Sequence, residues 1–375
     1  MKKLILSLIV LTSLTITNCS KSEDKNTPMQ ENPNDPYKEN PYHREPPITS
    51  ADFTLSEDGK TLVRWNNTTR TTLDMKAHPL LSQVTTIGTW AFEDRNSLKT
   101  IVFPETLTTI MGGAFSKTGL TSVIIPETVT SIGNYAFSNC NSLTSVSIPK
   151  TVTDLGDWIF ENCGNLEEVT YGPKTLKASL FNNCTSLRKV ILLEGVTTIG
   201  TWAFENRKAL KEIHFSSTVT TINANAFSGS GLSTITIPET ITTIGASAFS
   251  NCKSLTSASI PKSVISLGDW VFENCENLEE VTFGPKTLKN ALFSGCTNLK
   301  NVTLLEKITT IGPWAFENRT NFTTLTIKAT TPPSIGEITF KNTALTHIYV
   351  PAASVDSYKN DRKWGVFADK IQAIP

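Results

Sequence analysis

The segment IGTWAF at Ile87–Phe92 recurs along the chain and decides its fold. It returns as IMGGAF at Ile110–Phe115, IGNYAF at Ile132–Phe137, LGDWIF at Leu155–Phe160 and LKASLF at Leu176–Phe181. The final phenylalanine of the segment then recurs as Phe204, Phe227, Phe249, Phe272, Phe293, Phe316 and Phe340. The unit that ends at Phe340 is degraded. The steps between these phenylalanines are 21 to 24 residues. Such a period predicts a solenoid, because one unit of this size cannot bury its apolar face and has to stack on its neighbours.

Each unit also contains a stretch with the pattern of a strand. It reads NSLKTIVFP at Asn96–Pro104 and NSLTSVSIP at Asn141–Pro149. Its last apolar positions alternate with other residues, which is the period of a strand with one buried face. The proline that follows in several units ends the strand, because it has no N–H to donate. We therefore expect one strand per unit, then a turn at glycine and a short helical or irregular return.

The fold class that follows is a repeat solenoid of about twelve 21–24-residue units with a parallel β-sheet on one face. We expect an N-terminal β cap, with a hairpin turn at Ser56–Lys60 around Asp58-Gly59, and a C-terminal α/β cap. The expected domains are a lipoprotein signal peptide at 1–18, a disordered tether at 19–47, the N-terminal cap at 48–83, the leucine-rich repeat solenoid at 84–330, and a terminal repeat with the C-terminal cap at 331–375.

The sequence also has a longer repeat, which contains several of these units. Residues 147–195 recur almost verbatim at 259–307, an offset of 112 residues. The same offset relates Phe92 to Phe204 and Phe204 to Phe316. The pattern indicates that a block of five units was duplicated.

The repeated pattern I-G-x-x-A-F-x-x-C-x-x-L-x-x-V-x-I-P resembles the BspA-type leucine-rich repeat family of bacterial surface proteins. The resemblance extends over roughly residues 84–351, and Ile348–Ile374 is similar to the ending common in that family. The units at Leu176 and Leu288 depart from the pattern, with L-K in place of I-G. The resemblance implies an adhesin or another cell-surface recognition protein.

The N-terminus has the features of a bacterial lipoprotein. Lys2 and Lys3 precede an apolar stretch at Leu4–Ile16, which is too short to span a membrane, and Cys19 stands where the lipidated cysteine would be. The following Ser20–Asp24 resembles a surface-export signal, although an ordinary polar tether explains it as well. We expect an outer membrane lipoprotein, anchored through Cys19 and exposed at the cell surface, with the periplasmic face as the alternative.

Composition and motifs argue against several functions. The 34 basic and 34 acidic residues give a net charge of zero, which argues against a nucleic acid partner. The four histidines form no H-E-x-x-H motif, and no glycine-rich phosphate loop or G-x-S-x-G occurs. Glu167 and Glu168 are adjacent on a predicted strand, so we expect their side chains to point to opposite faces. Two such carboxylates cannot flank one glycosidic bond, as the catalytic acids of a glycosidase do. We expect no enzymatic activity, no cofactor and no metal site.

Six cysteines occupy one position of the repeat: Cys140, Cys163, Cys184, Cys252, Cys275 and Cys296. In an exported protein they could form disulfides. Their shared position favours instead a buried column of thiols in stacked turns, where parallel side chains have poor disulfide geometry.

Two sets of residues are candidates for ligand binding. Aromatic residues stand two positions before the repeat phenylalanine: Trp90, Tyr135, Trp158, Trp202, Trp270 and Trp314. Other units tolerate Gly113, Ser179 or Ser247 there, so this position is not deep core, although packing over the return arm also explains it. Outward strand positions form the second set, with Glu168, Glu212, His214 and Glu280.

Two functions remain open from the sequence. The first is a lipid-anchored surface module for binding or adhesion, which recognises a host protein, another cell or a glycan. The second is an accessory scaffold subunit of a surface or periplasmic glycan-capture assembly.

Overall fold

The structure is a computed structural model and describes residues 45–375. Pro47–Pro375 form one compact unit. The expected signal peptide, most of the expected tether and Cys19 lie outside the described residues.

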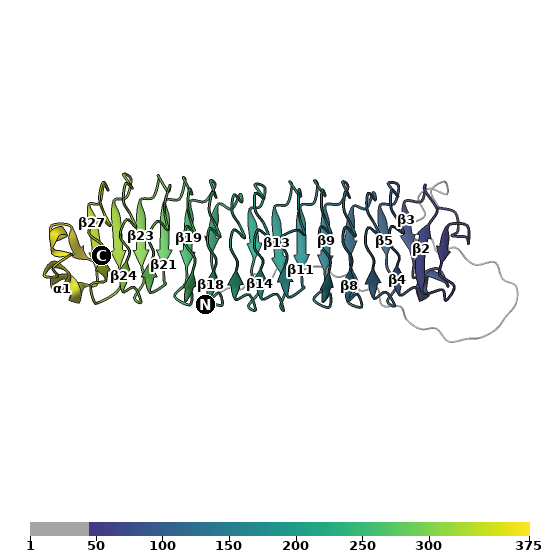
Figure 1. Cartoon of the computed structure of the whole chain (residues 1–375), viewed down its shortest axis with the longest axis horizontal. Coiled ribbons are helices and arrows are strands. Elements are labelled where there is room, and N and C mark those ends of the chain that lie inside the picture. Colours follow the sequence, from purple (N-terminus) through teal and green to yellow (C-terminus); the bar gives the residue numbers. More distant parts are fainter. Residues whose placement is uncertain (1–44) are drawn as a thin grey trace, which may run out of the picture. The chain divides into compact units, whose positions relative to one another are not determined.

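Each turn of the solenoid contributes one strand of three or four residues to one face of the stack, which we call the long sheet (Figure 1). Its parallel ladders form three groups, β3 with β5, β7 to β15, and β17 to β28. Twelve of these strands belong to the phenylalanine units, and one strand is added at each end. They are β3 (Thr72–Asp74), β5 (Thr100–Val102), β7 (Ser122–Ile124), β9 (Ser145–Ile148), β11 (Glu168–Tyr171), β13 (Lys189–Leu192), β15 (Glu212–His214), β17 (Thr234–Thr236), β19 (Ser257–Ile260), β21 (Glu280–Phe283), β23 (Asn301–Leu304), β25 (Thr324–Ile327), β27 (His347–Val350) and β28 (Ile371–Ala373). The predicted stack of about twelve units is confirmed.

A second parallel sheet is formed by two-residue strands just before the I-G or L-K position. They are β4 (Thr86–Ile87), β6 (Thr109–Ile110), β8 (Ser131–Ile132), β10 (Asp154–Leu155), β12 (Thr175–Leu176), β14 (Thr198–Ile199), β16 (Thr221–Ile222), β18 (Thr243–Ile244), β20 (Ser266–Leu267), β22 (Thr287–Leu288), β24 (Thr310–Ile311) and β26 (Ser334–Ile335). The sequence had indicated a turn here, so one sheet was expected and two are present. The return arms are tight turns rather than helices.

Both ends of the stack are covered. At the N-terminus, β1 (Phe53–Leu55) and β2 (Thr61–Trp65) form the predicted antiparallel hairpin, and β2 pairs with β4. A 3₁₀ turn, η1 (Leu81–Gln83), follows. At the C-terminus, η2 (Ala352–Ser354), α1 (Val355–Lys359) and η3 (Gly365–Phe367) precede β28, which pairs with β27. These elements satisfy the open edges that a solenoid would otherwise present.

The repeat phenylalanines form one stacked column through the core. Neighbouring rings from Phe92 to Phe340 lie 4.8 to 6.3 Å apart between centroids and are nearly parallel. Trp65 continues the column at the N-terminal end, and Trp364 contacts Phe340 at the other end. Because each ring covers the next, burial depends on neighbouring turns, as expected for a solenoid.

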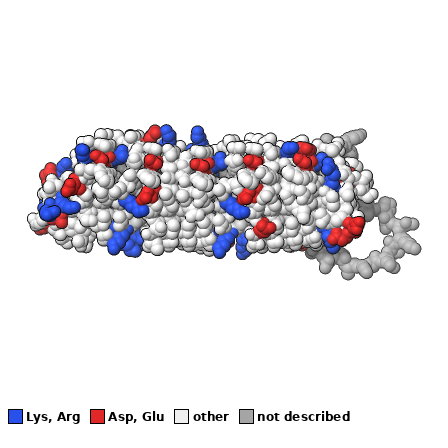
Figure 2. All heavy atoms as spheres, in the orientation of Figure 1, with Lys and Arg blue, Asp and Glu red and all other residues white. Residues whose placement is uncertain are grey.

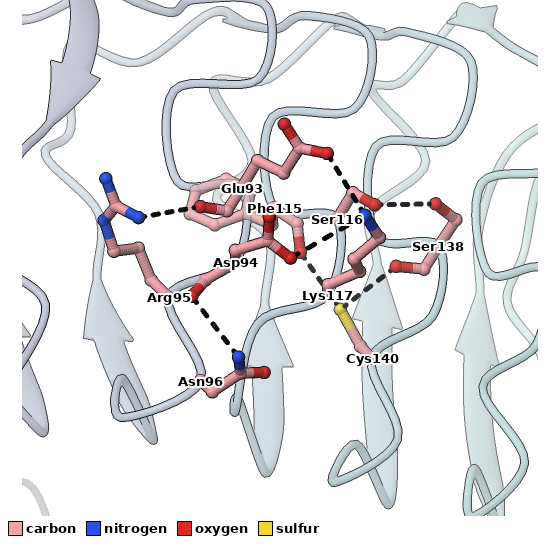
Figure 3. Close-up of polar contacts among 9 residues, drawn as sticks. All are labelled: Glu93, Asp94, Arg95, Asn96, Phe115, Ser116, Lys117, Ser138 and Cys140. Carbon is pink, nitrogen blue, oxygen red and sulfur yellow. Dashed lines mark hydrogen bonds and ion pairs between the residues drawn. The ribbon is translucent and has the colours of Figure 1, made fainter.

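The cysteines join adjacent turns through hydrogen bonds. Each of the six thiols is free and buried, and its Sγ donates to the main-chain carbonyl of the phenylalanine in the preceding turn, at 3.1 to 3.2 Å. Figure 3 shows this contact from Cys140 to Phe115, with the hydroxyls of Ser116 and Ser138 in contact beside it. The predicted thiol column is therefore present.

We predict that Leu166→Ala lowers the free energy of unfolding by about 2–5 kcal/mol, because Leu166 is fully buried just before β11 and alanine leaves a cavity. Leu80→Ala is the matched control: Leu80 is 54% exposed, and its loss should change stability by under about 0.5 kcal/mol. Chemical denaturation measures both. A comparably small loss for Leu166→Ala would contradict the packing.

We also predict that the Cys184 and Cys296 thiols stay unreactive in the folded chain. Burial raises the pKa of the Cys184 and Cys296 thiols from 9.0 to about 12. Between these values the unfolded thiols ionise while the folded ones stay protonated, so the free energy of unfolding should fall as the pH rises from about 9 to about 12. Ellman's reagent at pH 8 should label these cysteines slowly in the native chain and all six repeat cysteines after denaturation without reductant. Finding none free after denaturation would contradict the thiol column.

Candidate ligand-binding site

The aromatic residues before the repeat phenylalanine have an unusual backbone. The five tryptophans and Tyr135 have φ between 55° and 59°, in the left-handed region. Gly113, Asn225, Ser247 and Ala291 hold the same position in other turns with φ of 53° to 61°. This conformation suits glycine or asparagine and costs a bulky residue about 1–2 kcal/mol. The fold therefore requires the backbone conformation at this position but does not require an aromatic side chain.

The tryptophan side chains remain largely open to solvent. Their exposed fractions run from 39% for Trp158 to 53% for Trp202. Trp90 lies over Gly113, where an added Cβ would come within 2.0 Å of the indole. Trp158 stacks on Tyr135 with 5.3 Å between ring centroids. These side chains cover parts of neighbouring turns and still present apolar faces outward.

Adjacent turns approach closely after the short strand. A Cβ on Gly156 would lie 2.4 Å from the main-chain nitrogen of Asn134, and one on Gly268 would lie 2.2 Å from that of Ala246, so these two turns have no room for a side chain. Met111 and Asn223 hold the same position in other turns and still donate to the preceding turn. Lys177 and Lys289 occupy it in the two units that read L-K.

The short sheet is interrupted at both of these lysine turns. In the part of the chain that the structure describes, no ladder pairs β10 with β12 or β20 with β22. The lysines reach back across the interruption to the preceding turn. Lys177 Nζ donates to the Leu155 carbonyl and lies 3.7 Å from the Asp157 carboxylate, and Lys289 Nζ lies 3.1 Å from the Asp269 carboxylate. Each aspartate directly precedes a tryptophan of the aromatic set.

The second interruption opens into a groove of about 510 Å³. Its lining comes from three successive turns and combines an indole, an ion pair, an amide and hydroxyls over an apolar floor. The lining residues are Asp269, Trp270, Thr287, Leu288, Lys289, Asn290, Ala291, Thr310, Gly312 and Pro313. We name this the lysine-turn groove. Of the candidates predicted from sequence it contains only Trp270. The lysine and aspartate were missed, although the replacement of I-G by L-K marks them.

The outward residues of the long sheet form a separate surface with two shallow hollows. One, of about 250 Å³, contains Glu168 beside Ser145 and Ser147. The other, of about 330 Å³, contains Glu280 in the same arrangement one block later. Glu168 accepts a hydrogen bond from Arg188 Nη2 at 2.8 Å, and Glu280 accepts one from Asn301 Nδ2 at 3.3 Å.

The other two predicted residues of the long sheet lie outside these hollows. Glu212 and His214 are exposed on β15, with 3.5 Å between Glu212 Oε2 and His214 Nε2. The structure thus divides the predicted site residues between two surfaces: the tryptophans follow the short strands, and the glutamates and histidine follow the long strands.

Charge is distributed sparsely over the molecule. Figure 2 shows lysine, arginine, aspartate and glutamate in small mixed groups separated by wide uncharged areas on the face in view. Among residues 45–375, no group of three histidine, cysteine, aspartate or glutamate side chains could hold a metal ion. No helix within that range is long and apolar enough to cross a membrane.

Comparison with known proteins identifies the repeat. A model of the BspA type leucine rich repeat region matches residues 70–188, 174–290 and 284–361. A leucine-rich repeat protein from Bacteroides ovatus is 27% identical, with a TM-score of 0.58 and coverage of 84% of this chain and 88% of that one. A leucine-rich repeat protein from Eubacterium ventriosum is 26% identical, with a TM-score of 0.41 and coverage of 71% and 76%.

A third solved structure, a leucine rich cell surface protein from Faecalibacterium prausnitzii, is 24% identical, with a TM-score of 0.38 and coverage of 88% of this chain and 100% of that one. No curated protein matches the chain. The family model spans well over half of the sequence, and its repeat is the one that forms the phenylalanine column. The chain belongs to the BspA-type leucine-rich repeat family.

Proposed function

We propose that this protein is a non-enzymatic binding and adhesion module of the bacterial cell surface, anchored by lipid at Cys19. Its solenoid recognises a host protein, another cell or a glycan. Membership of the BspA-type family supports a surface repeat module that binds other molecules. The residues that the solenoid leaves exposed support its role in binding a host protein, another cell or a glycan.

The observation that carries the proposal is the row of exposed tryptophans in left-handed backbone. Trp202, Trp270 and Trp314 are about half exposed with φ between 55° and 59°. The left-handed backbone conformation is unfavourable for a bulky residue. Because these side chains are only partly buried, their burial offsets little of that free-energy cost. Serine and alanine occupy the same backbone position in other turns. Exposed aromatics that the fold does not need are the residues that most often dominate binding energies.

The long sheet offers a second, polar contact surface. Serine, threonine and glutamate line both of its hollows, one in each block. Parallel solenoid sheets present such residues at regular spacing, and repeat proteins commonly bind along them. A hydroxyl-rich surface with few charges suits contacts made by many weak hydrogen bonds.

The anchor is tested in cells that express the full chain. We predict that the protein sediments with membranes, incorporates a fatty-acid analogue and is degraded by trypsin added to intact cells. Cys19→Ala should shift it to the soluble fraction without incorporation, while Cys140→Ala, at a buried repeat cysteine, should leave incorporation unchanged. Absence of incorporation in the unaltered chain would contradict the lipid anchor, and protection from trypsin would contradict surface exposure.

The binding function is tested separately on the purified full chain. We expect saturable binding to at least one member of a panel of extracellular-matrix proteins and oligosaccharides, with reduced binding when exposed tryptophans are replaced by serine. Absence of binding across both halves of the panel would contradict the proposed function.

A further inference from the structure

We propose that the two lysine turns form a pair of equivalent carbohydrate sites, which bind pyranose rings repeated along one glycan chain. The inference rests on the proposed binding function and specifies its ligand and its residues. One site is the lysine-turn groove at Trp270, Asp269 and Lys289. The other is its counterpart at Trp158, Asp157 and Lys177.

The lysine stands at the same place in both blocks. Eight of the twelve units have glycine after the short strand, Met111 and Asn223 hold this position in two others, and the two units that carry lysine are separated by the 112-residue block offset. The interruption of the short sheet follows the lysine in both cases. Each lysine also meets the aspartate that precedes a tryptophan. Duplication of the block accounts for the recurrence, and both copies have lysine, aspartate and tryptophan at these positions.

The chemistry of the groove fits a pyranose ring. Such a ring has an apolar face of C–H groups and a rim of hydroxyls that both donate and accept hydrogen bonds. The Trp270 indole, 49% exposed, offers the flat apolar surface. The Asp269 carboxylate accepts, Lys289 donates, and the Asn290 amide does both. The ion pair holds Asp269 in place beside the indole, with 3.1 Å between Lys289 Nζ and its carboxylate.

The groove has a size suited to a small number of sugar rings. Its volume of about 510 Å³ lies within the common range for small-ligand sites. Its floor is made by small or apolar residues, Leu288, Ala291 and Gly312, so the space beside the indole stays open. Its fixed charges are one aspartate and one lysine, which favours an uncharged sugar over an anionic one.

The first block offers the same tryptophan, aspartate and lysine, but Ala178 stands where the second block has Asn290. Trp158 is 39% exposed and Asp157 accepts a hydrogen bond from Ser179 Oγ at 3.1 Å in addition to its contact with Lys177. Serine at 179 stands where the second block has alanine. The aspartate is thus oriented by two neighbours in the first block and by lysine alone in the second.

The spacing of the two sites favours a polymer. Five turns separate them, and at the spacing of parallel strands this is about 24 Å. An extended chain of several sugars can reach both sites at once. Such two-site binding strengthens affinity by mass action without any new contact.

The experiment measures binding of the purified full chain to neutral trisaccharides of glucose, xylose, mannose and N-acetylglucosamine, which are too short to reach both sites, and to the corresponding polysaccharides. Calorimetry and tryptophan fluorescence report binding. The variants are Trp158→Ser, Trp270→Ser and the double replacement, with Trp90→Ser as the matched control. Trp90 has the same backbone conformation, but Met111 rather than lysine holds the corresponding position in the turn that follows it. Ser247 shows that serine fits this position, and circular dichroism verifies folding.

We expect each single variant to lose half of the trisaccharide sites and to bind the polysaccharide at least about tenfold more weakly. The double variant should bind neither, and Trp90→Ser should behave as the unaltered chain. Trp270→Tyr should retain binding, because Tyr135 occupies the equivalent position in its own turn.

The other outcomes separate this inference from the proposed function. Binding of glycans that is equal in all variants would overturn the lysine-turn sites while leaving a binding module. Binding of a matrix protein with no glycan bound would overturn the carbohydrate assignment and leave the proposed function standing. Absence of binding to either class would overturn both.

Discussion

The stacking of one phenylalanine ring on the next sets the distance between turns, and the rest of the structure depends on that distance. With ring centroids 4.8 to 6.3 Å apart, adjacent turns are near enough for strand ladders on two sheets and for each thiol to reach the preceding phenylalanine carbonyl. At Gly156 and Gly268 the same distance leaves no room for a Cβ, which would collide with the preceding turn. Packing, hydrogen bonding and sequence pattern therefore have one common cause.

The column also continues where the solenoid opens. The short sheet is interrupted at the two lysine turns, while the phenylalanine rings stay stacked past the first of them, with 5.8 Å between Phe160 and Phe181. The solenoid tolerates the interruption because the long sheet continues through the same turns, from β9 to β13. A groove can thus form at one corner of the turn without loss of the stack, which is how a repeat scaffold acquires a local site.

Much of the fold could be predicted from the sequence, because the period of the phenylalanines and the alternation before the strand-ending prolines are direct signals of stacking and strand. The shared position of Cys140 and its equivalents likewise predicted a thiol column. The two-residue strands were missed because two residues are too few to show a period. Three other units have arginine at the position of the cysteine: Arg95, Arg207 and Arg319. This replacement was not predicted, because the cysteines indicated a position for small apolar side chains.

The candidate site was predicted only in part. The tryptophans were found because a position that accepts serine and tryptophan is not deep core, but their left-handed backbone could not be inferred, since tryptophan does not signal that conformation. Lys177 and Lys289 were noticed as departures from the pattern, yet the interruption of the short sheet beside them and their contacts with Asp157 and Asp269 are given only by the structure.

The central claim is that hydrogen bonds join adjacent turns along the short sheet except at the two lysine turns. Hydrogen–deuterium exchange tests this claim most directly, because it reports on each inter-turn hydrogen bond. The account predicts slow exchange at Thr197 and Gly200, which donate to the preceding turn, and at Thr309 and Gly312 one block later. At the lysine turns, the corresponding amides of Lys174, Lys177, Lys286 and Lys289 should exchange at least about tenfold faster, since local opening there breaks no ladder. Equal exchange rates for the amides of the lysine turns and of the glycine turns would contradict the interruption of the short sheet.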